Sequence, residues 1–370
     1  MKVCGITAEY NPFHNGHRYQ IEKTKEKTGA DVILAVMSGN FVQRGEPAVI
    51  DKWERAKAAV LNGVDVVIEL PNIYALQAAS RFAHGSVTLL KAAQVDCISF
   101  GSECGNLENL QEIAEAPINP DHLREYMAEG LSYPKAYSLL TSSMAPNDIL
   151  AVSYLKEMQN TKIEPVLIQR TSGYLDDTLD DNCSALAIRK AMKDHKDISQ
   201  ATPMHEALTE NTPVTMDLYY PYLRTLLLTS DRNHLQKMFL VNEGIETHLR
   251  SHAKEESTWE GFLSACTSSR YTESRIRRTC IHIMTQTSRE EAEQLKNPEV
   301  LRVLAFNETG RAWLHEAKKR EIRIASRYAE IPKPFRSQEY RSTLLYTSVM
   351  EEERRREILQ KEIEGARYIR

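Results

Sequence analysis

Two histidines lie three positions apart near the start of the chain, within His14-Asn15-Gly16-His17. They follow a short apolar run over residues 3–6, which predicts a buried strand, and the turn signal Asn11-Pro12. A helix N-terminus at this junction would offer free backbone N–H groups and a positive dipole end, which suit nucleotide phosphates. Histidines placed there would stabilise the charge that builds on an α-phosphate as pyrophosphate leaves. Alternatively, both side chains only cap a helix or face solvent.

Other residues suited to nucleotide contact follow later apolar runs. Arg44 lies in a glycine-containing loop after the second run, where it would meet a phosphate or pair with an acid such as Glu46. Gly101 ends another run, and its bare backbone would let adenine or ribose approach, although a plain turn would also use glycine. Arg170 follows the last run, a position that suits phosphate recognition.

Two predicted helix starts supply further polar groups. Asn147 is a candidate N-cap near the beginning of one helix, or else a contact to adenine or phosphate. Ser184 is expected to cap the next helix, and Arg189 lies about a turn and a half inside it. A hydroxyl and a basic residue at a helix start form a candidate clamp for leaving pyrophosphate.

Alternating strands and helices would position these residues. Strands are expected over residues 3–6, 32–37, 64–71, 95–101 and 165–168, and helices over 18–27, 52–62, 81–93 and 149–160. This alternation predicts an α/β fold with a parallel sheet that helices cover on both faces. Ligands of such sheets bind at the carboxyl ends of the strands, where the candidate residues cluster.

The pattern changes after about residue 196. Residues 223–228, 275–284, 290–295 and 300–306 are expected to be helical, and residues 351–368 a charged helix. We therefore expect two domains, an α/β domain over residues 1–195 and a mainly helical domain over residues 196–370.

Charge is distributed unevenly between these parts. The chain has a net charge of −4, yet its last 100 residues carry 21 Lys and Arg against 16 Asp and Glu. An excess of positive charge indicates a polyanion partner. Two clusters are candidate contacts, Arg275 with Arg277 and Arg278, and Lys318-Lys319-Arg320. The alternative is a set of solvated helix faces with paired charges, as expected for Arg354-Arg355-Arg356 after three glutamates.

Composition excludes several classes of protein. With 42% hydrophobic and 26% charged residues, the 370-residue chain is typical of a globular protein. No apolar run approaches the roughly 20 residues of a membrane span, and the N-terminus does not match a secretory signal, so a cytoplasmic protein without a membrane partner is expected. Six scattered cysteines without a C-x-x-C pair indicate neither a metal site nor disulfides, and buried thiols are expected for all six.

Several longer motifs together resemble the bacterial tRNA(Met) cytidine acetate ligase family, long described as nucleotidyltransferase-like. They are residues 9–17, 36–48, 63–71 and 100–103, continued by 146–151, Arg170 and 184–189. The resemblance is strong over the first 195 residues and weaker in the helical part, around residues 270–276. One position departs from the pattern, because Leu186 stands where related nucleotidyltransferases usually carry Ser or Thr.

The resemblance implies a Rossmann-like nucleotidyltransferase domain followed by a tRNA-binding domain. It also implies that ATP activates acetate as acetyl-adenylate and releases pyrophosphate. The acetyl group is then transferred to N4 of the wobble cytidine of elongator tRNA(Met), which gives N4-acetylcytidine. Independently of the resemblance, Mg²⁺ is the usual expectation on ATP phosphates.

The resemblance assigns roles to individual residues. His14, His17 and Arg189 would be catalytic. ATP would be bound by a larger set, namely Thr7, Ala8, Glu9, Tyr10, Asn11, Pro12, Phe13, His14, Asn15, Gly16, His17, Arg18, Tyr19, Gln20, Gly101, Asn147, Arg170 and Ser184. One alternative is a small-molecule nucleotidyltransferase that releases pyrophosphate. Another is a tRNA-binding or assembly protein that retains a degenerate nucleotide fold.

Overall fold

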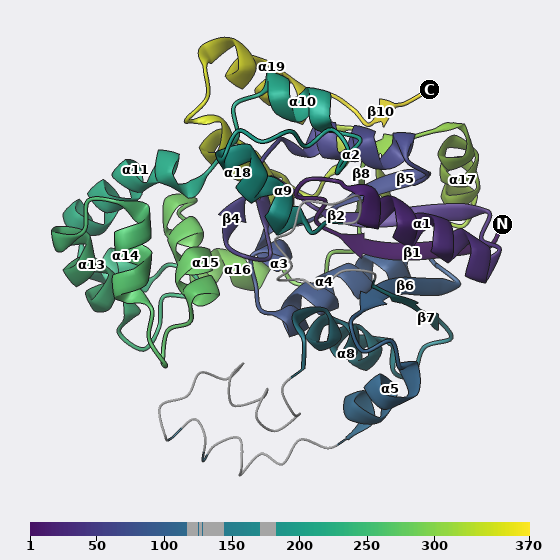
Figure 1. The fold of residues 1–370 in the computed structure, drawn as a ribbon, viewed down its shortest axis with the longest axis horizontal. Coiled ribbons are helices and arrows are strands. Elements are labelled where there is room, and N and C mark those ends of the chain that lie inside the picture. The colour runs from purple at the N-terminus through teal and green to yellow at the C-terminus, as the bar shows by residue number, and fades with distance from the viewer. Residues whose placement is uncertain (117–124, 126–127, 129–143, 171–182) are drawn as a thin grey trace.

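A mostly parallel sheet forms the centre of the computed structural model, which describes residues 1–116, 125, 128, 144–170 and 183–370 (Figure 1). The strand order is β10-β8-β5-β2-β1-β6-β7, with β9 paired to β8. The parallel strands are β1 (Val3–Ala8), β2 (Val32–Ser38), β5 (Val66–Leu70), β6 (Cys97–Ser102) and β7 (Glu164–Gln169). A separate antiparallel pair joins β3 (Phe41–Val42) to β4 (Glu46–Pro47).

Helices cover both faces of this sheet, which explains why its strands are continuous apolar runs. In β2 every residue is buried, and alternate side chains enter opposite cores. One face carries α3 (Asn72–Ala75), α4 (Ala79–Ala92), α5 (Leu107–Glu115), α8 (Pro146–Met158) and α17 (Glu308–Lys319). The other carries α1 (Asn15–Thr28), α2 (Lys52–Leu61), α9 (Ala185–Lys193) and α10 (His205–Glu210).

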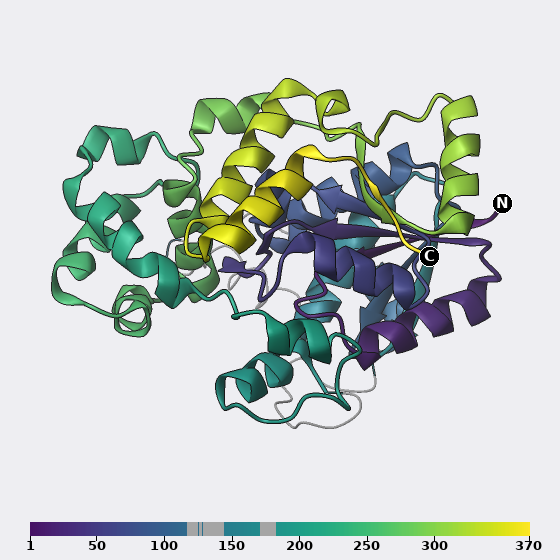
Figure 2. The same ribbon diagram turned by 90° about the horizontal axis from the view of Figure 1, so that it is seen from above.

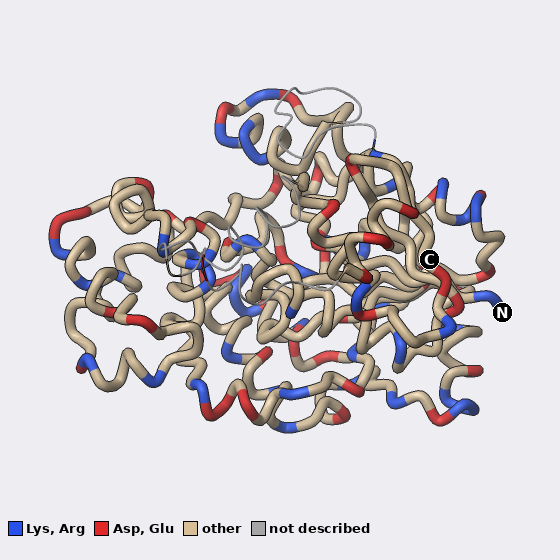
Figure 3. The backbone as a smooth tube through the Cα atoms, turned by 90° about the horizontal axis from the view of Figure 1, so that it is seen from below, with Lys and Arg blue, Asp and Glu red and all other residues tan. Residues whose placement is uncertain are grey.

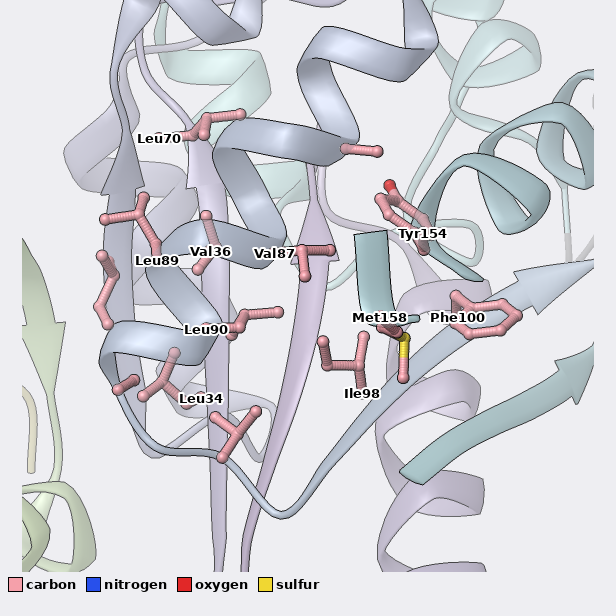
Figure 4. Packing of buried hydrophobic residues seen from close by; sticks show 14 of the residues in the cluster. Leu34, Val36, Leu70, Val87, Leu89, Leu90, Ile98, Phe100, Tyr154 and Met158 are labelled. Carbon is pink, nitrogen blue, oxygen red and sulfur yellow. The ribbon is translucent and has the colours of Figure 1, made fainter. Parts of the chain in front are cut away.

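The packing on the first face is shown in Figure 4. Leu89 and Leu90 of α4 lie against Leu34 and Val36 of β2, and the side chains of Tyr154 and Phe100 lie close together. The centroids of these two rings are 5.9 Å apart. This packing holds α4 and α8 against the sheet, and the first residues of both helices line the cavity described below.

The helical part packs around a core of its own at one end of the molecule (Figures 1 and 2). It comprises α11 (Met216–Thr229), α12 (Arg232–Gln236), α13 (Ile245–Glu255), α14 (Trp259–Cys266) and α15 (Glu273–Met284). The next helix, α16 (Arg289–Gln294), packs Ala292 against the core of the sheet's first face instead. Phe41 and Leu76 from the α/β part are buried in the core of the helical part. The two parts therefore share an apolar junction.

The chain then returns to the central sheet, which corrects one expectation. Residues 300–306 were expected to be helical, but Leu301–Phe306 form β8, which pairs antiparallel with β5. The charged segment 351–368 is helical only in α19 (Glu352–Ile363) and ends in β10 (Arg367–Tyr368), which pairs with β8. The remaining elements are β9 (Ile324–Ala325), a 3-10 turn at Tyr328–Glu330, and α18 (Lys333–Thr347).

Buried charges fasten this returning segment to the α/β part. Lys52 on α2 lies 2.6 Å from Glu69 on β5 and 2.8 Å from Glu362 on α19. Arg302 on β8 lies 2.5 Å from Glu69 and 2.7 Å from Glu362. Each cation thus contacts both acids, so that removing one partner would leave an uncompensated buried charge.

The other expected strands and helices of residues 1–195 are confirmed to within a few residues. One expectation about the cysteines is wrong, because five are buried but Cys104, in the turn between β6 and α5, is exposed. Within the described ranges, no helix is both long and apolar enough to cross a membrane.

Candidate active site

A cavity of about 610 Å³ opens at the carboxyl ends of the parallel strands. Its walls include the last residues of β1 and the end of β6, together with the first residues of α4, α8, α9 and α15. Helix N-termini present unpaired backbone N–H groups and partial positive charge. Their convergence on one cavity suits a polyanionic ligand such as a triphosphate.

His14 and His17 form a reciprocal cap at the start of α1. Nδ1 of His14 accepts a hydrogen bond from the Gly16 N–H at 3.1 Å, and Nδ1 of His17 accepts one from the His14 N–H at 3.2 Å. The two rings stack with centroids 3.7 Å apart. Since both Nδ1 atoms accept, each neutral ring carries its proton on Nε2. The histidines therefore cap the helix and also line the cavity as Nε2–H donors.

Burial and nearby cations keep these imidazoles neutral. Desolvation, with Arg170 and Arg189, lowers the pKa of His14 to about 3. Desolvation, His14 and Arg170 lower the pKa of His17 well below its ordinary value. Arg170 and Arg189 both lie near enough to His14 to lower its pKa. The fold therefore brings together residues from three distant parts of the sequence. A phosphate would therefore meet neutral donors flanked by two fixed positive charges.

Arg189 and Ser184 occupy the expected positions on α9. Ser184 is the N-cap and accepts a hydrogen bond from the Ala187 N–H at 3.1 Å. Arg189 donates to the carbonyl oxygen of Asn11 at 2.8 Å and lies 3.8 Å from a carboxylate oxygen of Glu46. The guanidinium is thus held at the cavity wall. Leu186 also lines the cavity, with an apolar side chain where a hydroxyl was expected from the family pattern.

Gly101, Asn147 and Arg170 all line the cavity, but Asn147 is not a helix cap. Ala145 is the N-cap of α8, and the Asn147 side chain instead donates to Glu103 at 2.5 Å. The neighbouring Asp148, which sequence reasoning missed, accepts hydrogen bonds from the Ser102 hydroxyl and the Glu103 N–H. These bonds tie the start of α8 to the end of β6.

Several residues that no sequence motif indicated hold the backbone around the histidine motif in place. The Thr202 hydroxyl donates to the Phe13 carbonyl at 2.6 Å, and the Asn15 side chain donates to the Gln200 carbonyl at 2.6 Å. The fully buried Arg55 donates to the carbonyl oxygens of Ile50, Glu9, Ser38 and Gly39. Arg55 thereby joins the ends of β1 and β2. No sequence motif marks this role, because all the acceptors are backbone atoms.

The loop over residues 39–47 lies between the cavity and the helical part. On the cavity side, the Gln43 N–H donates to Glu9, and Glu46 faces Arg189. On the other side, Arg277 of α15 pairs with Glu46, and Arg278 donates to the Gln43 carbonyl at 3.1 Å. Arg44, one of the candidate phosphate contacts, lines the cavity.

The structure places most of the predicted ATP-binding residues on the cavity wall. They are Thr7, Ala8, Glu9, Tyr10, Asn11, His14, His17, Gln20, Gly101, Asn147, Arg170 and Ser184, and Arg189, predicted to be catalytic, lies on the same wall. The predicted residues outside that wall are Pro12, Phe13, Asn15, Gly16, Arg18 and Tyr19. Three residues at the α15 end, Thr272, Ser274 and Arg278, were not predicted to line the site.

The profile of the HIGH Nucleotidyl Transferase family matches residues 1–361. The chain belongs to this family. It is 37% identical to the tRNA(Met) cytidine acetate ligase of Anoxybacillus flavithermus over 98% of both chains. It is 40% identical to the tRNA(Met) cytidine acetate ligase of Limosilactobacillus reuteri over 86% of this chain and 88% of the relative. The family resemblance drawn from the motifs is therefore confirmed.

Solved structures support the fold over the full length. The crystal structure of Thermotoga maritima TmcAL bound with alpha-thio ATP matches with a TM-score of 0.89 and 30% identity, covering all of both chains. The apo structure of the same protein also gives a TM-score of 0.89, at 29% identity. The α/β fold with a mostly parallel sheet is thus confirmed.

Proposed function

We propose that this protein is an ATP-dependent tRNA(Met) cytidine acetate ligase. The observation that carries the proposal is one cavity whose wall includes both His14 and His17 and the start of α15 in the helical part. The names of relatives that align with 86–98% of the chain support the same activity. A small-molecule nucleotidyltransferase is less well supported, because it would not need the helical wall.

In the first half-reaction, the chain holds ATP and acetate together. The Nε2–H groups of His14 and His17 would donate to the α-phosphate oxygens as acetate attacks, where charge develops. Arg189 would stabilise the leaving pyrophosphate, beside the N-terminus of α9 that Ser184 caps. Gly101, Asn147 and Arg170 would complete the nucleotide site.

Mg²⁺ is expected on the ATP phosphates, as is usual for such substrates. Among the described residues, no group of three or more His, Cys, Asp and Glu side chains is placed to hold a metal ion. Ligands from the triphosphate and water would therefore have to supply most of the ion's coordination.

In the second half-reaction, the helical part would bring the anticodon loop of elongator tRNA(Met) to the cavity. Bases of such loops are readily splayed out of their stack. The start of α15 lines the cavity, whereas α17, which carries Lys318 and Lys319, lies at the opposite end of the molecule (Figures 1 and 2). Charges of both signs are interspersed along the tube in Figure 3. We therefore place the first RNA contacts near α15. The reaction would take place in the cytoplasm.

Many basic residues of the candidate clusters already have acidic partners. Arg275 lies 3.1 Å from Glu243, and Lys319 lies 2.7 Å from Glu316. Arg354, Arg355 and Arg356 pair with glutamates on their own helix, as the alternative interpretation expected. RNA phosphates would therefore have to compete with these carboxylates.

A direct test supplies the purified protein with ATP, Mg²⁺, labelled acetate and elongator tRNA(Met). We expect acetate-dependent exchange of pyrophosphate into ATP without tRNA, and N4-acetylcytidine at the wobble position after nuclease digestion. The same tRNA with uridine at that position is the control. Label in both tRNAs, or in neither, would contradict the proposal.

A further inference from the structure

The two proposed half-reactions differ in one chemical requirement. Acetate attacks the α-phosphate as a carboxylate, so that no proton has to leave the nucleophile. The exocyclic amine of cytidine, in contrast, must lose a proton as its nitrogen bonds to the acetyl carbon. A general base is therefore needed only in the second step, and such a base typically contributes about 10²–10⁴ in rate.

Most proton acceptors on the cavity wall are already engaged. His14 and His17 use Nδ1 as the acceptor in the helix cap. Glu46 lies between two arginines, Arg189 and Arg277. The carboxylate of Glu157 lies 3.0 Å from Nδ1 of His84.

Glu9 differs from these groups. It directly follows β1 on the wall of the cavity, in the segment that leads to the histidine motif. Its Oε1 accepts one hydrogen bond, from the Gln43 N–H at 2.5 Å, which orients the carboxylate. Within the described part of the chain, Oε2 accepts no hydrogen bond. Burial raises the pKa of Glu9, while the Gln43 N–H and the charges of Arg44, Arg189 and Arg55 act in the opposite direction. Tyr154 of α8 also lies near this carboxylate.

We infer that Glu9 is the general base of acetyl transfer, an inference that rests on the proposed ligase function. Oε2 of Glu9 takes a proton from the cytidine N4 amine as nitrogen bonds to the acetyl carbon. The bond between that carbon and the phosphate oxygen breaks, and its electron pair leaves with AMP. The raised pKa makes Glu9 a stronger base than an exposed glutamate while it remains ionised above that pKa.

The test is Glu9→Gln, which preserves an acceptor for the Gln43 N–H but removes the base. We expect single-turnover transfer of labelled acetyl to tRNA to slow by about 10²–10⁴. Because Glu9 also lies on the wall of the predicted ATP site, acetate-dependent ATP–pyrophosphate exchange should fall as well, but far less than transfer. Wild-type transfer should slow as the pH falls through the pKa of Glu9, and the variant should lack that limb. Glu9→Asp should recover part of the transfer rate.

The matched control is Glu157→Gln, the same charge change on the same wall, which should leave both half-reactions within a few-fold. Equal losses of exchange and transfer in Glu9→Gln would show that Glu9 only supports the 39–47 loop, and would overturn the inference. Unchanged transfer would overturn it as well. Wild type that exchanges pyrophosphate but acetylates no tRNA would instead refute the ligase function, and the inference with it.

Discussion

Replacing His14 by Asn should separate the catalytic role of this residue from its structural role. Asn is among the best N-cap residues, so its side-chain oxygen can accept the Gly16 N–H hydrogen bond that His14 now accepts. It has no donor at the position of Nε2. The variant should therefore keep α1 intact and lose only the contact to the α-phosphate.

The expected magnitudes follow from these two contacts. Loss of a preorganised donor to developing charge typically costs about 10²–10³ in rate, or about 2.7–4 kcal/mol. Loss of an N-cap, as in His14→Ala, costs about 1 kcal/mol of stability. His14→Asn and His14→Ala should thus be similarly slow, but only the alanine variant should be destabilised.

The assays are acetate-dependent ATP–pyrophosphate exchange, ATP affinity and urea unfolding. His17→Gln is a companion variant, because its side-chain oxygen can still accept from the His14 N–H. Since the two rings stack and would serve one phosphate, the double variant should lose less than the product of the single losses. An exchange rate of His14→Asn within a few-fold of wild type would refute the catalytic assignment.

Three further outcomes are expected. His14 has a folded-state pKa of about 3, below its ordinary 6.5, so the unfolded chain binds this proton first as the pH falls. As the pH falls from 6.5 toward 3, the free energy of unfolding of wild type should therefore decrease by about 1.4 kcal/mol more per pH unit than that of His14→Asn. Urea unfolding measures both, and parallel pH profiles of the two proteins would contradict this expectation. Lys52→Met should cost about 3–5 kcal/mol, because Arg302 alone then faces Glu69 and Glu362 and one buried negative charge is left uncompensated. Lys57→Met, at an exposed position of the same helix, should cost below about 1 kcal/mol, and similar urea midpoints of the two variants would contradict the buried cluster. Arg270→Glu, beside α15, should weaken tRNA binding and flatten its salt dependence more than Lys319→Glu on α17. If filter binding gives the reverse order, the RNA-binding surface lies near α17 and not near α15.

The parts of the fold that follow from local sequence were predictable. Buried parallel strands are short apolar runs, and those of β1, β2, β5, β6 and β7 are separated by stretches long enough for helices. The segment Leu301–Phe306 has the same apolar character, yet a run of six residues does not distinguish a strand from part of a helix. Its partner β5 lies far away in the sequence, so that tertiary pairing decides its conformation.

The residues of the site likewise include some that could be predicted from the sequence and some that could not. The histidine pattern, Arg170, Ser184 and Arg189 were indicated by residue type and by their places next to predicted strands and helices. Arg55 and Thr202 were not, because they act on backbone carbonyls that any sequence would provide. Arg278 was interpreted as an RNA contact from charge alone, whereas in the fold it donates to the Gln43 carbonyl and lines the cavity.

The antiparallel pairing of β8 with β5 has a consequence for how the protein is made in a cell. Val303 pairs with Ile68, so 235 positions separate the partners, and at roughly 5–20 residues per second a ribosome needs roughly 10–50 s to cover them. Throughout this time the nascent chain presents β5 as an unpaired sheet edge, which is a template for aggregation. We expect ribosome-bound chains arrested before β8 emerges to be protease-sensitive or bound by chaperones, and chains arrested after β10 emerges to resist proteolysis. Protection that already appears when only residues 1–195 have emerged would mean that β5 is safe without its late partner.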